Sequence, residues 1–401
     1  MEKLKMSKIE KHKMSIFVVL NLLLTIGMNL GHPVTPTLIK SLGLPPRVFG
    51  ISFAAMCFSN FIFALVWSNV ANGMKKSRIL MISAIGYALT QIMFGYSTTE
   101  LQIYGARLLS GIFAGGFQVG LMSYVVNESP EDSQARYITI NSILISVGAA
   151  LGFFLGGMIG DISVRLTFVI QAILDVVVGV AMYLLLGPYE SVEEHLELSM
   201  IKDSNPLNIV KKSKHLLRDI ILILMIVNLV SSIGVTLFDQ SFNYYIKDIF
   251  NFKPSQNGLI KAVTGVFALV LNVILIRMGR KKKGQESILI VVLLIMGVTS
   301  LWVANLRTAA MFVGISLIWF GVYTMMIPLL QNSIIARKHS VEEGNQISGL
   351  YNSVLMLGKI AGALLTSYTY SKNPLSPFWV AGVTFLFSGC LLIFGKKKYQ
   401  S

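Results

Sequence analysis

The chain has 401 residues, of which 54% are hydrophobic and only 13% are charged, and its formal net charge is +15. A soluble domain of this length needs more charged side chains to cover its surface. The composition therefore excludes an ordinary soluble protein and indicates an integral membrane protein.

Twelve stretches of the chain are long and apolar enough to cross a bilayer, for which about 18 apolar residues suffice. Backbone polar groups in hydrocarbon must be bonded within their own segment, and the alternating pattern of a β-barrel is missing, so these spans are predicted to be helices. In chain order the predicted spans are 14–37, 46–70, 77–97, 100–125, 134–160, 164–187, 219–246, 256–278, 285–304, 308–335, 346–370 and 375–395.

Lys and Arg residues are concentrated in alternate connections between these spans, as in the basic runs 75–78, 211–218 and 396–398. Such residues favour the cytoplasmic side of a membrane. We therefore predict a multi-pass protein of the cell membrane, with both termini cytoplasmic. The bilayer accounts for the positive charge, so no nucleic acid partner is predicted, and the short outer loops favour a bacterial cytoplasmic membrane.

One long polar stretch divides the spans into six and six. The predicted domains are an N-terminal six-helix bundle (1–187), a cytoplasmic central loop (188–218) and a C-terminal six-helix bundle (219–401). The loop is either an amphipathic segment on the membrane surface or a solvated linker. Basic turns at 68–80 and 272–285 occupy the same place in each half, which is typical of transporters built from repeats, with a substrate site between the halves.

Three motifs lie within this frame. The turn after the second span carries Asn72, Gly73, Lys75 and Lys76, and its copy in the second half carries Arg277, Gly279 and Arg280. The fourth span contains Arg107 and, four residues later, Gly111. The fifth span contains Gly148, Gly152, Gly156 and Gly157.

These motifs resemble those of the major facilitator superfamily, most closely its twelve-span drug:proton antiporter branch. Asn72 stands where that family has an acidic residue, and Phe153 stands where its fifth span has proline. The resemblance implies an all-α membrane fold of two pseudo-symmetric six-helix bundles. It also implies transport by alternating access.

The glycines of the fifth span lie four residues apart and therefore share one helix face. Small residues allow close backbone approach between membrane helices. This face is predicted either to pack against another helix or, as the resemblance favours, to form a gating contact between the halves.

Few charged or titratable side chains lie within the spans, where each charge costs at least roughly 2.5–3.5 kcal/mol. Asp239, Asp175 and His32 are candidates for proton coupling, because a buried group can exchange a proton when its access to water changes. Their alternatives are an ion pair of Asp239 with Lys247 or Lys261, an ion pair of Asp175 with Lys359 or Arg107, and a hydrogen-bonded His32 at a helix bend. Arg107 and Lys359 are predicted to be cavity charges or, alternatively, members of structural ion pairs.

Polar and aromatic side chains in the spans could line a broad pocket for lipophilic compounds, or could simply pack between helices. The candidates for this substrate cavity are Gln118, Asn141, Gln240, Asn243, Trp319, Tyr323, Gln331 and Asn352.

The sequence lacks the phosphate-binding loop of ATPases and the common metal-ligand and nucleophile motifs. We therefore predict no enzyme activity, no cofactor and no metal site. The predicted function is proton-coupled efflux of lipophilic or amphipathic small molecules by a monomer whose partners are its substrate, protons and the bilayer. The alternatives are a symporter or uniporter for a specific metabolite or lipid precursor, and a receptor that binds without transport.

Overall fold

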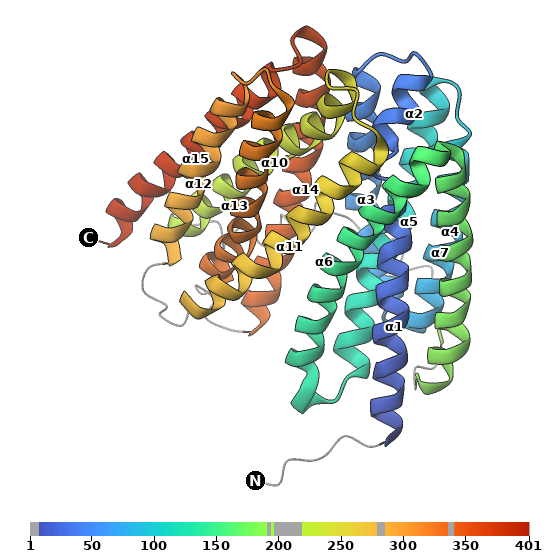
Figure 1. The fold of residues 1–401 in the computed structure, drawn as a ribbon. Coiled ribbons are helices and arrows are strands. Elements are labelled where there is room, and N and C mark those ends of the chain that lie inside the picture. Colours follow the sequence, from blue (N-terminus) through green and yellow to red (C-terminus); the bar gives the residue numbers. More distant parts are fainter. Residues whose placement is uncertain (1–7, 191–193, 196–218, 279–284, 336–340, 401) are drawn as a thin grey trace. The chain divides into compact units, whose positions relative to one another are not determined.

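The computed structural model describes residues 8–190, 194–195, 219–278, 285–335 and 341–400, and every regular element in these ranges is helical (Figure 1). The elements of the first half are α1 (Lys8–Leu30), α2 (Thr35–Ser41), α3 (Arg47–Val70), α4 (Lys76–Gly95), α5 (Glu100–Glu128), α6 (Glu131–Ile162), α7 (Val164–Leu186) and the short 3-10 helix η1 (Gly187–Tyr189). Those of the second half are α10 (Asp219–Asp248), α11 (Pro254–Met278), α12 (Gln285–Val303), α13 (Ala309–Ile335), α14 (Val341–Lys372) and α15 (Ser376–Gln400).

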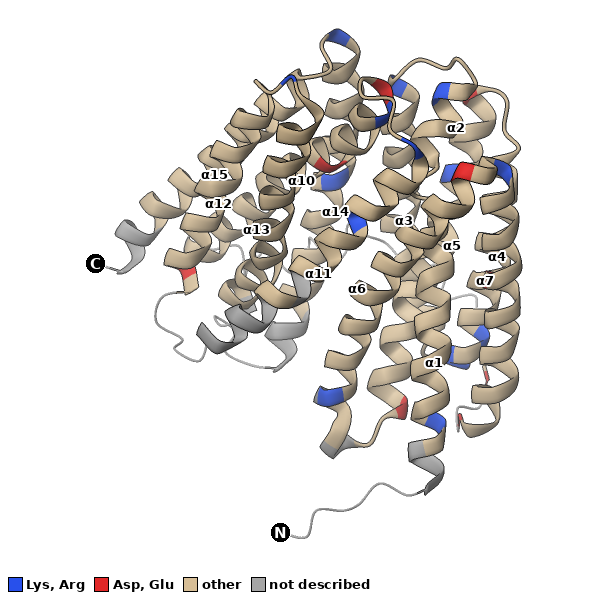
Figure 2. Cartoon of the chain, viewed as in Figure 1, with Lys and Arg blue, Asp and Glu red and all other residues tan. Residues whose placement is uncertain are grey.

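Among the described residues, 11 helical segments are long and apolar enough to span a membrane. The first of these combines α1 and α2, and α11 supplies the remaining predicted span. Charged residues are sparse along these helices and lie mostly towards their ends (Figure 2). The predicted all-helical membrane fold with twelve spans is therefore confirmed.

Local sequence signals determine where several helices begin and end. Thr99 and Gln102 form a capping box at the start of α5, and Ser163 accepts a hydrogen bond from the backbone N–H of Leu166 at the start of α7. Such caps satisfy N–H groups that have no partner within the helix. The first span breaks between Leu30 and Thr35, at the position of Pro33, where the sequence predicts a bend.

The chain forms two compact units. Unit 1 comprises residues 1–38, 59–205 and 253–262, and unit 2 comprises residues 39–58, 206–252 and 263–401. The start of α11 thus belongs to the unit that holds most of the first half. The start of α3 belongs to the unit that holds most of the second half. The domain boundaries at 188 and 218 stay a prediction.

The helices of the two halves pair in the same order. In unit 1, α1 packs against α6 and α7, and α4 packs against α5 and α7. In unit 2, α10 packs against α14 and α15, and α12 packs against α13 and α15. Counted by spans, each pairing of the first half recurs six spans later. The internal repeat suggested by the two basic turns is therefore present in the helix packing.

Candidate functional site

Arg107 is a buried cation of unit 1, with only 6% of its surface exposed. Its Nη2 atom donates a hydrogen bond to the Thr35 hydroxyl at 3.1 Å, and its guanidinium carbon lies 3.7 Å from the centroid of the Phe94 ring. The face of an aromatic ring attracts such a cation, more strongly when water is excluded. Contacts with α2 and α4 therefore hold the guanidinium of Arg107, which extends from α5, in a defined position.

Asp175 is fully buried in α7, and both of its carboxyl oxygens lack a hydrogen-bond partner in the described structure. The carboxyl faces α1 at Gly27, where an added Cβ would collide with Oδ1. Removing an unpaired carboxylate from water is costly, and binding of a proton removes that cost. Asp175 therefore has the surroundings that a proton-binding site requires.

Gln171 lies one helical turn before Asp175 and faces Gly31, the residue that follows α1. It is fully buried, and its Oε1 atom would lie 2.6 Å from a Cβ at Gly31. This oxygen also lacks a partner, while Nε2 makes a long hydrogen bond of 3.5 Å to the carbonyl of Met28. Three oxygens of α7 without a hydrogen-bond partner, two from Asp175 and one from Gln171, thus lie near α1 and the residue that follows it.

The other two candidates for proton coupling lie in different surroundings. His32, in the turn between α1 and α2, stacks on Phe153 of α6 with ring centroids 5.4 Å apart. Asp239 is half-buried in α10 of unit 2, where Asn243 donates to its backbone oxygen at 2.9 Å and to its carboxyl at 3.5 Å. Asp175 and His32 therefore belong to unit 1, and Asp239 belongs to unit 2.

Lys359 lines a small cavity within unit 2, of about 40 Å³, enclosed by α10, α13 and α14. Tyr323, one of the predicted candidates for the substrate cavity, also lines it. Three further polar residues of its wall are missed by that analysis, and these are Asn228, Ser232 and Tyr351. Asn228 and Ser232 are spaced one helical turn apart in an otherwise apolar span, which is the signal that could have found them.

Trp319 is fully buried and packs between Phe238 and Tyr323, with ring centroids 3.8 Å and 5.5 Å away. It belongs to an aromatic cluster of α10, α13 and α15 and is not part of the cavity wall that holds Lys359. The Trp319 ring therefore supports the ring of Tyr323 from outside the cavity wall.

The remaining candidates for the substrate cavity are distributed over both units. Asn141, on α6 of unit 1, accepts a hydrogen bond of 2.7 Å from Asn21 of α1, and Gln118 is exposed on α5. The candidates in unit 2 are the buried Gln240 and Asn243, the half-buried Gln331 and the exposed Asn352. The polar pair of Asn21 and Asn141 therefore links α1 to α6.

The glycines of α6 allow its backbone to touch that of α1. A Cβ at Gly152 would lie 2.5 Å from the carbonyl of Ile26, and a Cβ at Gly156 would collide with the carbonyl of Leu30. Unit 2 repeats this arrangement, since a Cβ at Gly362 of α14 would lie 2.7 Å from the carbonyl of Ile233 in α10. This face of α6 therefore packs against α1.

Gly157 lies beside this face and contacts the start of α11, which is part of unit 1. A Cβ there would lie 2.5 Å from the carbonyl of Pro254. Asp161, one turn later, accepts a hydrogen bond of 3.0 Å from the backbone N–H of Ser255. A carboxylate at a helix N-terminus is stabilised by the helix dipole. The C-terminal end of α6 therefore contacts and caps the first turn of α11.

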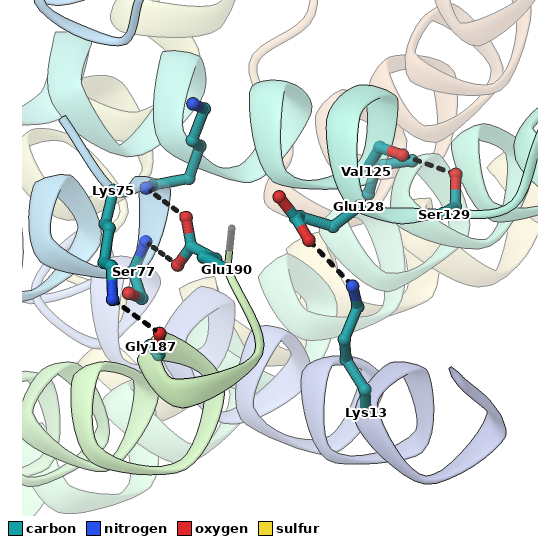
Figure 3. A network of polar contacts seen from close by, with 9 residues as sticks. Lys13, Lys75, Ser77, Val125, Glu128, Ser129, Gly187 and Glu190 are labelled. Carbon is teal, nitrogen blue, oxygen red and sulfur yellow. Dashed lines mark hydrogen bonds and ion pairs between the residues drawn. The ribbon is translucent and has the colours of Figure 1, made fainter. Parts of the chain in front are cut away.

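The turn after the second span is tied to the end of the sixth. Glu190, which is 5% exposed, accepts hydrogen bonds from the backbone N–H groups of Lys76 at 2.6 Å and Ser77 at 2.9 Å. Lys75 donates from Nζ to the carbonyl of Gly187 at 3.0 Å (Figure 3). The first turn of α4 is thus capped by a carboxylate that lies far along the chain.

Two further contacts add to this network. Glu194 pairs with Arg78 at 2.8 Å. Glu128 at the end of α5 pairs with Lys13 of α1 at 2.7 Å (Figure 3). Asn72 and Gly73 form the turn itself through backbone hydrogen bonds. In the second copy of the motif, Gly279, Arg280 and the side chain of Arg277 lie outside the described residues. Gly111 is buried in α5.

Comparison with known proteins decides the family. Residues 17–363 match the sequence profile of the Major Facilitator Superfamily.

The chain belongs to the major facilitator superfamily. This facilitator is 23% identical over 401 residues to Multidrug resistance protein 2 of Bacillus subtilis (strain 168), with 98% of each chain covered. It is 22% identical over 394 residues to the quinolone resistance protein NorA of Staphylococcus aureus (strain MSSA476), with 94% of this chain and 95% of that one covered.

Solved structures share the fold of this facilitator. The nucleoside transporter NupG superposes with a TM-score of 0.72 at 12% identity, covering 96% of this chain and 99% of that one. The human organic anion transporter MFSD10 superposes with a TM-score of 0.65 at 16% identity, covering 96% and 99%. The protein is therefore a multi-pass secondary transporter of small molecules and not an enzyme, as the sequence analysis predicts.

Proposed function

We propose that this facilitator exports lipophilic or amphipathic small molecules in exchange for protons. The full-length similarity to two drug resistance proteins supports the substrate class. The observation that carries proton exchange is the buried carboxyl of Asp175, which has no hydrogen-bond partner and faces a glycine of α1. The protein would work as a monomer in a bacterial cytoplasmic membrane, with both termini in the cytoplasm.

Proton exchange at Asp175 would act on α1. This helix packs against α6 on one face and α7 on another. With a proton bound, the carboxyl fits against Gly27 without an unpaired charge. When the proton leaves, the carboxylate must reach water or a cation, because burying it unpaired is costly. Release of the proton would therefore favour a shift of α7 away from α1, which is a conformational change that substrate binding could exploit.

Arg107 would serve this cycle as a fixed cation. Its contacts with Thr35 and Phe94 hold it in place, and arginine does not release its proton under ordinary conditions. Asp239 and His32 stay further candidates for the proton. The gating role of Gly148, Gly152, Gly156 and Gly157 likewise stays a proposal, supported by the contact of Gly157 with the start of α11.

A second candidate function is symport or uniport of a specific metabolite or lipid precursor. It is favoured by Phe153, which stands where the antiporter branch has proline and which stacks on His32. An α6 that continues without a break from Glu131 to Ile162 and contacts the turn between α1 and α2 departs from that branch at this point.

Reconstituted protein distinguishes these functions. Liposomes that contain the protein and an interior pH dye are given an outward or inward gradient of ethidium, without a membrane potential. Antiport predicts proton movement opposite to ethidium in both directions and none in protein-free liposomes. Proton movement in the same direction as a transported metabolite would support symport, and ethidium movement without protons would contradict exchange.

A further inference from the structure

Lys359 lies within the membrane-spanning part of α14 and makes no hydrogen bond or ion pair in the part of the chain that the structure describes. Lys359 lines the cavity of about 40 Å³ in unit 2. An ammonium group held inside a membrane protein needs an anion, a polar partner or water. The structure therefore leaves this cation available to a partner from outside the chain.

The wall around Lys359 carries hydrogen-bond donors from three helices. Tyr323 of α13, Tyr351 of α14 and Ser232 of α10 each supply a hydroxyl. Asn228 uses its amide to donate to the backbone carbonyl of Tyr351 at 2.9 Å, which ties α10 to α14 at the cavity. A cation with several hydroxyl groups around it suits an anion whose oxygens accept hydrogen bonds.

None of the residues that line this cavity is acidic. Asp239 interacts electrostatically with Tyr323, but it is absent from the lining of the cavity. Its backbone and carboxyl oxygens receive hydrogen bonds from Asn243 instead. The charge inside the cavity is therefore that of Lys359.

The rest of the lining is apolar and includes Val235, Met326 and Leu355. The cavity volume of about 40 Å³ exceeds the roughly 10–15 Å³ that one water molecule needs on the same measure. It therefore has room for a small anionic group, while the body of a larger ligand would have to lie outside it.

We propose that this cavity is an anion subsite that holds the carboxylate of an amphipathic substrate, with Lys359 as the counter-ion and Tyr323 as a hydrogen-bond donor. The subsite rests on the proposed export of amphipathic molecules and narrows it, because it assigns a place to substrates that carry a negative charge as well as an apolar body. Met326 supplies an adaptable wall, since methionine side chains adjust to irregular shapes.

Binding of matched probes tests the subsite. Pyrenebutyrate, its neutral primary amide and its trimethylammonium analogue share one apolar body and differ in charge. Equilibrium dialysis of purified protein in neutral detergent measures the affinity for each. We expect the wild type to bind pyrenebutyrate more tightly than the amide, and Lys359→Met to weaken pyrenebutyrate by at least about tenfold with little effect on the amide.

Three variants accompany this measurement. Lys359→Arg should keep most of the preference because it keeps the charge, and Tyr323→Phe should lose a smaller part of it. Lys372→Met, at the end of the same helix, removes an exposed lysine next to Tyr368 and should leave all three affinities unchanged. Equal weakening of all three probes by Lys359→Met would indicate a packing role and overturn the subsite, as would unchanged binding of pyrenebutyrate.

The anionic group that binds at Lys359 could also come from the headgroup of a lipid. Added phosphatidylglycerol should not displace pyrenebutyrate, and pyrenebutyrate should move across liposomes that contain wild-type protein. Displacement without transport would make the cavity a lipid site and overturn the substrate assignment. If the protein exchanges ethidium for protons but binds pyrenebutyrate no more tightly than the amide, the subsite is rejected and the proposed function is retained.

Discussion

Glu190 accepts hydrogen bonds from the backbone N–H groups of Lys76 and Ser77, although 114 and 113 residues separate it from them in the chain. The carboxylate lies at the N-terminus of α4, where the helix dipole favours negative charge. The family places an acid in the turn before this helix, and this chain has Asn72 there instead. A carboxylate that follows the sixth span thus caps the start of the third span.

Replacing Glu190 should destabilise unit 1. Glu190→Ala leaves two N–H groups of the first turn of α4 without their acceptor, and the loss of a helix cap costs roughly 0.5–2 kcal/mol. Chemical unfolding in detergent measures this loss. The control is Glu194→Ala, which removes an ion pair with Arg78 and a long, exposed hydrogen bond of 3.3 Å from the backbone N–H of Lys75. The side chains of Arg78 and Glu194 are 43% and 30% exposed, and a pair of this kind contributes about 0–1 kcal/mol. An effect of Glu194→Ala that equals that of Glu190→Ala would argue against a buried cap.

The close approach of α6 to α1 predicts that even a methyl group is harmful there. Gly156→Ala would place a Cβ against the carbonyl of Leu30, and overpacking of this kind costs typically about 1–3 kcal/mol. We expect a lower melting temperature and slower transport. Gly105→Ala is the matched control, because nothing lies within 4 Å of a Cβ at this exposed position of α5. If both variants behave alike, the contact between the two backbones does not restrict α6.

The hydrogen bond between Asn21 and Asn141 predicts a non-additive pair of mutations. Asn21→Leu leaves the buried amide of Asn141 without its partner, which costs roughly 1–3 kcal/mol. The double variant Asn21→Leu/Asn141→Leu removes both polar groups and should be more stable than the sum of the single variants predicts. Thermal unfolding of the four proteins provides the double-mutant cycle. Strictly additive effects would show that the two side chains are not coupled.

Arg107 should be sensitive to a change that keeps its charge. Arg107→Lys loses the planar group that lies over Phe94 and donates to Thr35, and arginine and lysine are not equivalent at such sites. We expect transport to slow at least several-fold while the protein stays folded. Arg165→Lys is the comparison, because that guanidinium carbon lies farther from its ring, 5.4 Å from the centroid of Tyr96. Transport by Arg107→Lys at the wild-type rate would show that the charge alone suffices.

The membrane fold could be predicted because its signals are local. The length of each apolar run is a property of one segment, and the helices lie close to the predicted spans from the first to the last. The glycines spaced by four predicted a packing face for the same reason. The helix that covers this face could not be identified, because a spacing within α6 carries no information about α1.

The candidate site was harder to predict, because it depends on contacts between distant segments. Glu190 reads as part of a polar loop, and only the fold brings it to the first turn of α4. Trp319 and Tyr323 are both aromatic and lie one helical turn apart on α13, so the sequence does not distinguish them. In the structure Trp319 belongs to the aromatic core and Tyr323 to the cavity wall. A buried acid such as Asp175 is visible in the sequence, but its lack of partners is visible only in the structure.

Proton coupling through Asp175 is the central claim, and one comparison tests it most directly. Wild type, Asp175→Asn and Asp239→Asn are reconstituted with an interior pH dye, and ethidium-driven proton movement is measured beside the exchange of labelled for unlabelled ethidium, which needs no net proton flow. We expect Asp175→Asn to abolish proton movement while it keeps ethidium exchange, and Asp239→Asn to keep both. Proton movement at the wild-type rate in Asp175→Asn would contradict the claim.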